Sequence, residues 1–245
     1  MACCSLDVLP VELIHHLLNY FSVHEIFYTF TNVSSYIDDV LLNYSSYCVN
    51  FKSVTRKEFN SVCQRIKPDQ VVSLTLSDGE DTAGQVELFL SRFQINQFTR
   101  LRSLTLIDVG PDYWEPIVGK LIDLKNIRSF IYFSSNNNDS SPSKIPYDNV
   151  GVLDQRMSDS YNPILPQLTR LRLSHGDYLS SVQFPYLRHL ILQRCKPNII
   201  QHICNAAPQL QSLETELQCN QNPDFIFSSN QLNRLVLQIT GESIF

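Results

Sequence analysis

The chain has 245 residues, of which 43% are hydrophobic and 18% are charged, and its formal net charge is -5. This composition predicts a globular protein with a substantial core rather than a disordered segment. Lysine and arginine are spread thinly, and no apolar run reaches the roughly 18 residues of a membrane span, so we expect no nucleic acid and no membrane as partner. The start of the chain lacks the basic and apolar segments of a secretory signal, and we expect a cytoplasmic or nuclear location.

The opening segment predicts three short helices. Pro10 suits a first helical position because its φ angle is fixed and it leaves no N–H group unpaired. Ser22 and Glu25 have the spacing of a capping box, so a second helix is expected from about Val23. Asn32 is the expected N-cap of a third helix. Apolar residues recur at helical spacing after these starts: Leu13, Ile14, Leu17, Leu18, Phe21, Ile26, Phe27, Phe30, Val33, Tyr36, Ile37, Val40, Leu41 and Tyr44.

Three helices in residues 10–44 form a unit that is too small to bury all of these side chains. Something else must cover the apolar residues that remain. In one interpretation the helices simply cap the core of the following domain. In the other they leave an exposed apolar surface that docks a partner, since large apolar surfaces on soluble proteins usually mark interfaces.

Four short stretches carry a family resemblance: Leu9-Pro10-x-Glu12-Leu13, Tyr20-Phe21-Ser22, Ile26-Phe27 and Val33-Ser34-Ser35-Tyr36. Together they resemble the F-box, a three-helix motif, which we assign to residues 1–45. The resemblance implies docking onto the small adaptor subunit of an SCF-type cullin-RING ubiquitin ligase, with the substrate held by a second domain. The positions that match the docking surface of the family are Leu9, Pro10, Leu13, Ile14 and Leu17.

A repeated pattern fills most of the remaining chain. The pattern is apolar-x-x-apolar-x-apolar, and its starts are 30, 26, 41, 19, 23 and 22 residues apart, centred on the roughly 20–29 residues of leucine-rich repeats. Its alternating part predicts a strand with the leucines facing inward, and stacked repeats form one curved parallel sheet. Residues 46–245 therefore resemble a leucine-rich-repeat solenoid, and the whole chain resembles an α/β protein of the F-box and leucine-rich-repeat family. The pattern starts at Val71, Leu101, Ile127, Leu168, Leu187, Leu210 and Leu232.

Further elements are expected between these strands. The segment from Tyr47 to Phe51 alternates like an additional first strand, and Thr55 and Glu58 form a second capping box that begins a helix. Residues 86–93 and 117–122 carry a helical stripe. The longest spacing is rich in Ser, Asn, Asp and Pro without periodicity, which predicts an inserted loop at about residues 134–163, either mobile or functional.

Strand alternation also places a second set of side chains on the outward face of the sheet. Along this face, small hydroxyl residues give way to an apolar patch and then to a basic one. Aromatic and arginine side chains are typical anchors of protein interfaces, which favours a target-binding surface. A solvated sheet face with cross-strand packing is the alternative. The candidate target-binding residues are Ile107, Ile131, Phe133, Arg170, Arg172, His189 and Ile191.

The sequence contains no recognisable catalytic or metal-binding motif. Its seven cysteines form no C-x-x-C pair and are expected as reduced thiols. Neither an H-E-x-x-H zinc motif nor a glycine-rich phosphate loop is present, so we expect no enzyme activity, metal or cofactor. The sequence favours a substrate-recognition subunit of an SCF-type ubiquitin ligase, with the adaptor subunit, the cullin scaffold and an unknown target protein as partners. The alternative is a repeat scaffold without a link to ubiquitin.

Overall fold

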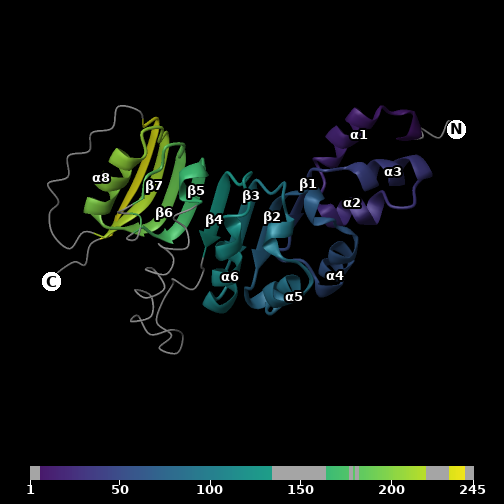
Figure 1. The fold of residues 1–245 in the computed structure, drawn as a ribbon, viewed down its shortest axis with the longest axis horizontal. Helices are drawn as coiled ribbons and strands as arrows, with labels where there is room; N and C mark the ends of the chain where they lie inside the picture. The colour runs from purple at the N-terminus through teal and green to yellow at the C-terminus, as the bar shows by residue number, and fades with distance from the viewer. Residues whose placement is uncertain (1–5, 134–163, 177–178, 180–181, 219–231, 241–245) are drawn as a thin grey trace.

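The computed structural model describes residues 6–133, 164–176, 179, 182–218 and 232–240. Within these ranges the chain forms one eight-stranded sheet whose strands lie in sequence order, from β1 to β8 (Figure 1). All neighbouring strands in this sheet are parallel. Each connection therefore has to return to the starting edge of the sheet, and helices fill several of these returns. The predicted parallel sheet is confirmed.

The strands lie where the apolar patterns predict them. The alternation after Tyr47 forms β1, β2 begins at the first residue of its pattern, and the later strands begin at the third residue. The strands are β1 (Tyr47–Asn50), β2 (Val71–Ser77), β3 (Ser103–Ile107), β4 (Ser129–Phe133), β5 (Arg170–His175), β6 (His189–Cys195), β7 (Ser212–Gln218) and β8 (Arg234–Thr240).

The register aligns equivalent residues of successive repeats. One inward row runs across the sheet from Leu74 in β2 to Leu213 in β7, and its members are fully buried. Burial of one such side chain contributes about 1.5–3 kcal/mol, so this row stabilises the stacking of each repeat on the next. The row consists of Leu74, Leu104, Phe130, Leu171, Leu190 and Leu213. Its member in β8, Leu235, is exposed at the last described strand.

Helices and short 3-10 turns connect the strands. Thr55 and Glu58 form both hydrogen bonds of the predicted capping box at the start of α4. The two predicted helical stripes form α5 and α6, whereas α8 was not predicted. Figure 1 shows α4, α5 and α6 along one side of the sheet. The helices are α4 (Arg56–Arg65), α5 (Gln85–Arg92), α6 (Pro111–Leu121) and α8 (Pro197–Ala206), and the turns are η2 (Pro68–Gln70), η3 (Glu80–Thr82), η4 (Ile95–Gln97) and η6 (Leu165–Gln167).

The amino-terminal segment forms η1 (Leu6–Val8), α1 (Val11–Leu18), α2 (Val23–Thr29) and α3 (Ser35–Asn43). The capping box of Ser22 and Glu25 is present at the start of α2, as predicted. The predicted N-cap of α3 is wrong. Ser34 caps this helix by accepting a hydrogen bond from the N–H group of Ile37, and Asn32 has a φ angle of +61°. Asparagine tolerates this left-handed conformation, so Asn32 forms the turn before the helix.

The inner face of the three helices packs on the first strand and the first return helix of the array. The Phe27 ring of α2 lies 5.4 Å from the Tyr47 ring of β1, and the Tyr44 ring lies 4.8 Å from that of Tyr47 (centroid distances). Arg65 of α4 donates a hydrogen bond of 3.0 Å to the carbonyl oxygen of Phe27. One continuous cluster of buried apolar residues joins the helices to the repeats. The helices therefore cap the amino end of the array, and the domain boundary at residue 45 stays a prediction.

The inserted loop at about residues 134–163 lies outside the described residues. Within the described residues, none of the helices combines the length and apolar character that crossing a membrane requires.

Candidate protein-binding surfaces

The predicted docking residues in and just before α1 divide between surface and core. Pro10 and Leu13 are exposed, with 55% of Leu13 accessible, and Leu9 and Leu17 are half-buried. Ile14 is only 1% exposed and belongs to the buried cluster. It faces inward because α1 needs an apolar side to pack on α3. Ile14 therefore leaves the candidate docking surface and supports the helix from within.

Two apolar side chains outside the set of predicted docking residues lie beside them in the sequence. Val8 is 79% exposed, and Val11 is also exposed. We call Val8, Pro10, Val11 and Leu13 the amino-terminal apolar surface. Their position in sequence, directly around the Leu-Pro pair, is the signal that sequence reasoning overlooked. Of the ten large hydrophobic side chains that are exposed in the described residues, seven lie in the three-helix unit. Exposed apolar area is therefore concentrated on these helices.

Hydrogen bonds hold the start of this surface on the third helix. The hydroxyl of Tyr36 donates to the carbonyl oxygen of Leu9 at 2.8 Å. The hydroxyl of Ser34, the N-cap of α3, donates to a carboxylate oxygen of Asp7 at 2.5 Å. Both bonds join residues 27 positions apart in the sequence. The short η1 turn is thus fixed before a partner arrives, which lowers the entropy that binding would cost.

The structure brings the predicted target-binding residues together on one face of the sheet, which we call the open sheet face. In the register, Ser129, Arg170 and His189 form one row, and Ile131, Arg172 and Ile191 form the next. Ile107 pairs with Phe133 on the neighbouring strands. Arg170 is exposed, and the other predicted residues are half-buried. The predicted target-binding residues therefore share one face, as strand alternation predicts, whereas two serines that the same alternation would place outward, Ser77 and Ser174, are buried.

Arg172 and Phe133 form a defined contact within the open sheet face. The guanidinium carbon of Arg172 lies 5.0 Å from the centroid of the Phe133 ring, which is the distance of a cation–π interaction. The Nε atom of Arg172 is buried and has no hydrogen-bond partner among the described residues. The planar arginine group is therefore stacked in place beside Ile131, and it presents a flat, positively charged element next to apolar side chains.

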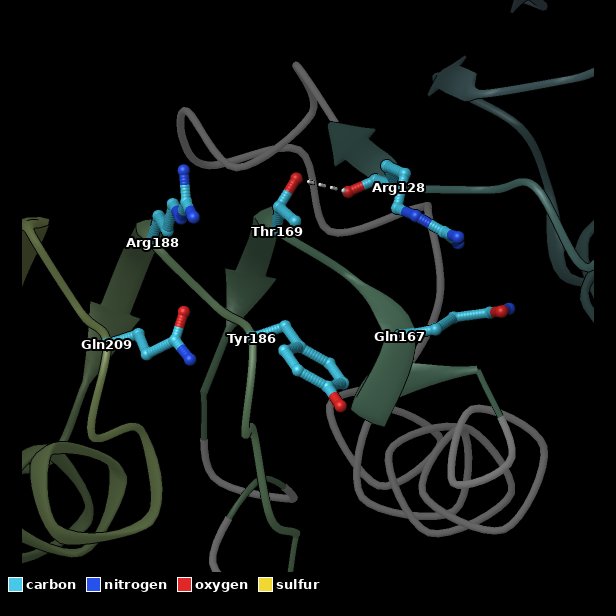
Figure 2. A pocket seen from close by; sticks show the side chains of 6 residues that line it. All are labelled: Arg128, Gln167, Thr169, Tyr186, Arg188 and Gln209. Carbon is cyan, nitrogen blue, oxygen red and sulfur yellow. Dashed lines mark hydrogen bonds between the residues drawn. The ribbon is translucent and has the colours of Figure 1, made fainter.

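A separate cavity of about 410 Å³ lies at the edge where the strands begin (Figure 2). We call it the amino-edge groove. Its lining side chains come from the segments that precede β4, β5, β6 and β7. The hydroxyl of Thr169 donates to the carbonyl oxygen of Arg128 at 3.1 Å, which joins two of these segments. The lining residues are Arg128, Gln167, Thr169, Tyr186, Arg188 and Gln209. None of these was predicted as a site residue.

Two of the described cysteines, Cys63 and Cys204, have environments that disfavour nucleophilic chemistry. Burial raises the pKa of the Cys204 thiol to about 11, and burial also raises the pKa of Cys63 to about 11 although Arg92 acts in the opposite direction. A thiol with such a pKa carries little thiolate at neutral pH. The described residues also contain no group of three or more His, Cys, Asp or Glu side chains that is arranged to hold a metal ion.

A parallel sheet built from one strand per repeat, with helices on one side and an open face on the other, defines a leucine-rich-repeat-like solenoid. The fold is similar to a chain in the crystal structure of the Rad7 and Elc1 complex in yeast, with a TM-score of 0.51 and 15% sequence identity. The alignment covers 95% of this chain and 59% of the solved chain. No family model matches the sequence, and no curated protein matches it.

Proposed function

We propose that this protein is a non-enzymatic substrate-recognition subunit of an SCF-type cullin-RING ubiquitin ligase. In this proposal the three amino-terminal helices form a divergent F-box that docks onto the adaptor subunit, which connects the chain to the cullin scaffold. The repeat array then holds a target protein on its open sheet face. The protein itself contributes binding and positioning, and the other subunits of the ligase carry out ubiquitin transfer.

The amino-terminal apolar surface is the observation that carries this proposal. The inner face of the helices is anchored on the array, whereas Val8, Pro10, Val11 and Leu13 point away from the core. Exposed apolar residues gathered at a preorganised turn and at the start of the following helix are typical of a protein interface. Its position coincides with the Leu-Pro stretch that resembles the F-box. The chain of similar fold comes from a complex of two proteins, Rad7 and Elc1, which supports the idea that this architecture accommodates a second protein.

The open sheet face supports the second half of the proposal. Ile107, Ile131 and Phe133 provide apolar area beside Arg170 and Arg172. An aromatic and arginine cluster of this kind supplies anchors for a partner, because these side chains contribute large contact areas with few rotatable bonds. A rigid array of parallel strands holds these anchors in a fixed arrangement, which is what selection of one target among many requires.

The alternative is a repeat scaffold in which the helices act only as a cap. The packing of Phe27, Tyr44 and Tyr47 favours this alternative for the inner face of the helices, since these contacts bury apolar area without any partner. It does not account for the exposed residues of the outer face. The two functions therefore differ in one respect, which is whether Val8 and Leu13 contact another protein.

Co-purification distinguishes the two functions. We expect the tagged wild-type chain to capture the adaptor and the cullin from cells, and the Val8→Asp, Leu13→Asp double variant to lose both, because a carboxylate cannot be buried in an apolar interface without a large cost. The matched control is Ile122→Asp, since Ile122 is 56% exposed at the end of α6, far along the chain from the helices. If the double variant retains the adaptor, or the wild type never binds it, the ligase function is wrong.

A further inference from the structure

We propose that the amino-edge groove binds the acidic side chains of an extended segment of the target protein, so that two guanidinium groups receive carboxylate or phosphate oxygens. This inference rests on the proposed function only in naming the bound segment as part of a ligase target. The groove itself lies on the array, and its binding can be measured without the adaptor. It differs from the open sheet face, because its residues precede the strands.

The charge of the groove is the first argument. Arg128 and Arg188 both line it, and no carboxylate is among its lining residues, although the whole chain has a net charge of -5. Within the described residues, the Arg188 guanidinium has no hydrogen-bond or ion-pair partner. Arg128 donates from Nη1 to the carbonyl oxygens of Lys125 and Ile127, at 3.1 and 2.8 Å, which fixes one edge of its guanidinium. Guanidinium groups form their strongest hydrogen bonds with carboxylate and phosphate oxygens.

The repeat register gives the groove a regular spacing. Arg128, Thr169 and Arg188 each stand one residue before a strand, in β4, β5 and β6 respectively. Gln167, Tyr186 and Gln209 each stand three residues before a strand, and Figure 2 shows them as a second row beside the first. The groove thus repeats the same two positions across neighbouring repeats. A ligand that runs across the strand starts meets equivalent positions at every step.

This spacing selects the conformation of the bound segment. The backbones of Arg128 and Arg188 lie two strand intervals apart, which is about 10 Å because neighbouring strands are about 4.8 Å apart. In polyproline II conformation, residues three apart lie on the same side of the peptide and are separated by about 9 Å. An acidic residue at every third position therefore matches the spacing of the backbones that carry the two arginines. Tyr186 is exposed in the middle of the groove, and its ring offers the aromatic surface on which such peptides pack.

The amides of the second row complete the polar character of the groove. Gln167 and Gln209 both line it; Gln167 already donates from Nε2 to the carbonyl oxygen of Leu124 at 3.4 Å, which holds its amide in place and leaves its carbonyl oxygen as an acceptor, whereas Gln209 offers both N–H donors and an acceptor. An extended peptide in polyproline II conformation has no internal hydrogen bonds, so its backbone N–H and C=O groups are free to pair with these amides. The arginines then select acidic side chains, and the glutamines hold the peptide backbone.

The test is direct binding of a fluorescein-labelled peptide of Glu-Pro-Pro repeats to the full chain, followed by fluorescence anisotropy. We expect saturable binding that weakens with rising salt, and no binding of the matched Gln-Pro-Pro peptide. Arg188→Gln should weaken binding at least about fivefold through loss of charge-assisted hydrogen bonds, whereas Arg188→Lys should lose less because it retains the charge. The control is Arg56→Gln, which removes an exposed arginine on α4 outside the groove. Melting temperatures of all variants confirm that they are folded.

The outcomes separate the two sources of oxyanion and the two proposals. Stronger binding of a phosphoserine-Pro-Pro peptide than of the glutamate peptide assigns the groove to phosphorylated targets, and equal binding assigns it to acidic ones. Absence of binding to both peptides, or equal affinity of Arg188→Gln and the wild type, overturns the inference. Neither result affects adaptor capture, so a failed groove leaves the proposed ligase function standing. Loss of adaptor capture in the wild type would in turn leave the peptide result intact.

Discussion

The contact between Phe27 and the first strand tests whether the helices and the repeats fold as one unit. Phe27 is 8% exposed, and its ring centroid lies 5.4 Å from that of Tyr47. The guanidinium carbon of Arg65 lies 5.8 Å from the Phe27 ring centroid. Replacing a buried phenylalanine by alanine costs about 3–5 kcal/mol, since it removes transfer free energy and leaves a cavity. We expect Phe27→Ala to destabilise the protein by an amount in this range.

The assay is thermal unfolding followed by circular dichroism and by differential scanning calorimetry. For a chain of about 150–250 residues, each kcal/mol shifts the melting temperature by about 2–4 °C, so Phe27→Ala should lower it by about 10 °C. If the buried cluster is continuous, the whole transition moves together. The matched control is Tyr28→Ala on the same helix, where the ring is 91% exposed and the change in stability should stay within about 0.5 kcal/mol.

A different pattern would refute this reasoning. If Phe27→Ala splits off a small early transition and leaves the main transition in place, the helices unfold separately from the array. The boundary predicted at residue 45 would then separate two independent domains. Equal melting temperatures of Phe27→Ala and Tyr28→Ala would show that the packing on Tyr47 contributes nothing measurable.

Three further predictions concern the backbone, the helix caps and the thiols. Gly176→Ala should destabilise the protein by about 1–3 kcal/mol, because a Cβ there would approach a leucine methyl carbon to 2.8 Å and a cysteine sulfur to 2.9 Å. The control is Gly119→Ala, where a Cβ meets nothing within 4 Å, so the melting temperature should stay the same or rise. Hydrogen bonds from the side chain and backbone of Thr55 lower the pKa of Glu58 below its ordinary value of 4.5. The ionised cap therefore stabilises the folded protein in full at pH values above 4.5, and this stabilisation is lost as the pH falls through the lowered pKa. Between neutral pH and strong acid, the melting temperature of Glu58→Gln should therefore fall by less than that of the wild type. An identical fall in both proteins would contradict a stabilising role for the ionised Glu58. Burial raises the pKa of Cys204 to about 11, so this thiol should react with iodoacetamide much more slowly in the native chain than in the denatured chain. Mass spectrometry measures both rates, and equal rates would argue against the burial of Cys204.

The strands were predictable because one signal repeats. The pairing of Leu74 with Leu104, and of Leu104 with Phe130, follows from the apolar alternation alone, and the same alternation places Ile131 beside Arg172. Capping boxes were predictable for a related reason, since Ser22 and Thr55 each find a glutamate three residues later. In these cases, the local pattern and the tertiary structure require the same residues.

Other features depend on choices that a local pattern leaves open. Asn32 and Ser34 are both good N-caps, and only the fold decides that Ser34 begins α3 while Asn32 forms the left-handed turn. The fate of Ile14 also depends on packing, because a helix with apolar residues on much of its surface has more than one possible inner side. α8 was overlooked although Pro197 stands at its first position and Ile200 and Ile203 are buried at helical spacing.

The amino-edge groove was overlooked for a different reason. Its residues are far apart in the sequence, and Arg128 meets Thr169 because the strands that follow them, β4 and β5, are neighbours in the sheet. Polar residues just before a strand look like ordinary solvent-exposed turn residues when one repeat is considered alone. Their alignment appears only after all the strands are placed in one register.

The central claim is that another protein covers the amino-terminal apolar surface, and a titration of the purified adaptor into the purified chain tests it most directly. Isothermal calorimetry should show binding with a negative heat-capacity change, which is the signature of apolar burial. The Val8→Asp, Leu13→Asp variant should lose this binding, and Ile122→Asp should retain it. Absence of binding by the folded wild-type chain, or unchanged affinity of the double variant, would contradict the account.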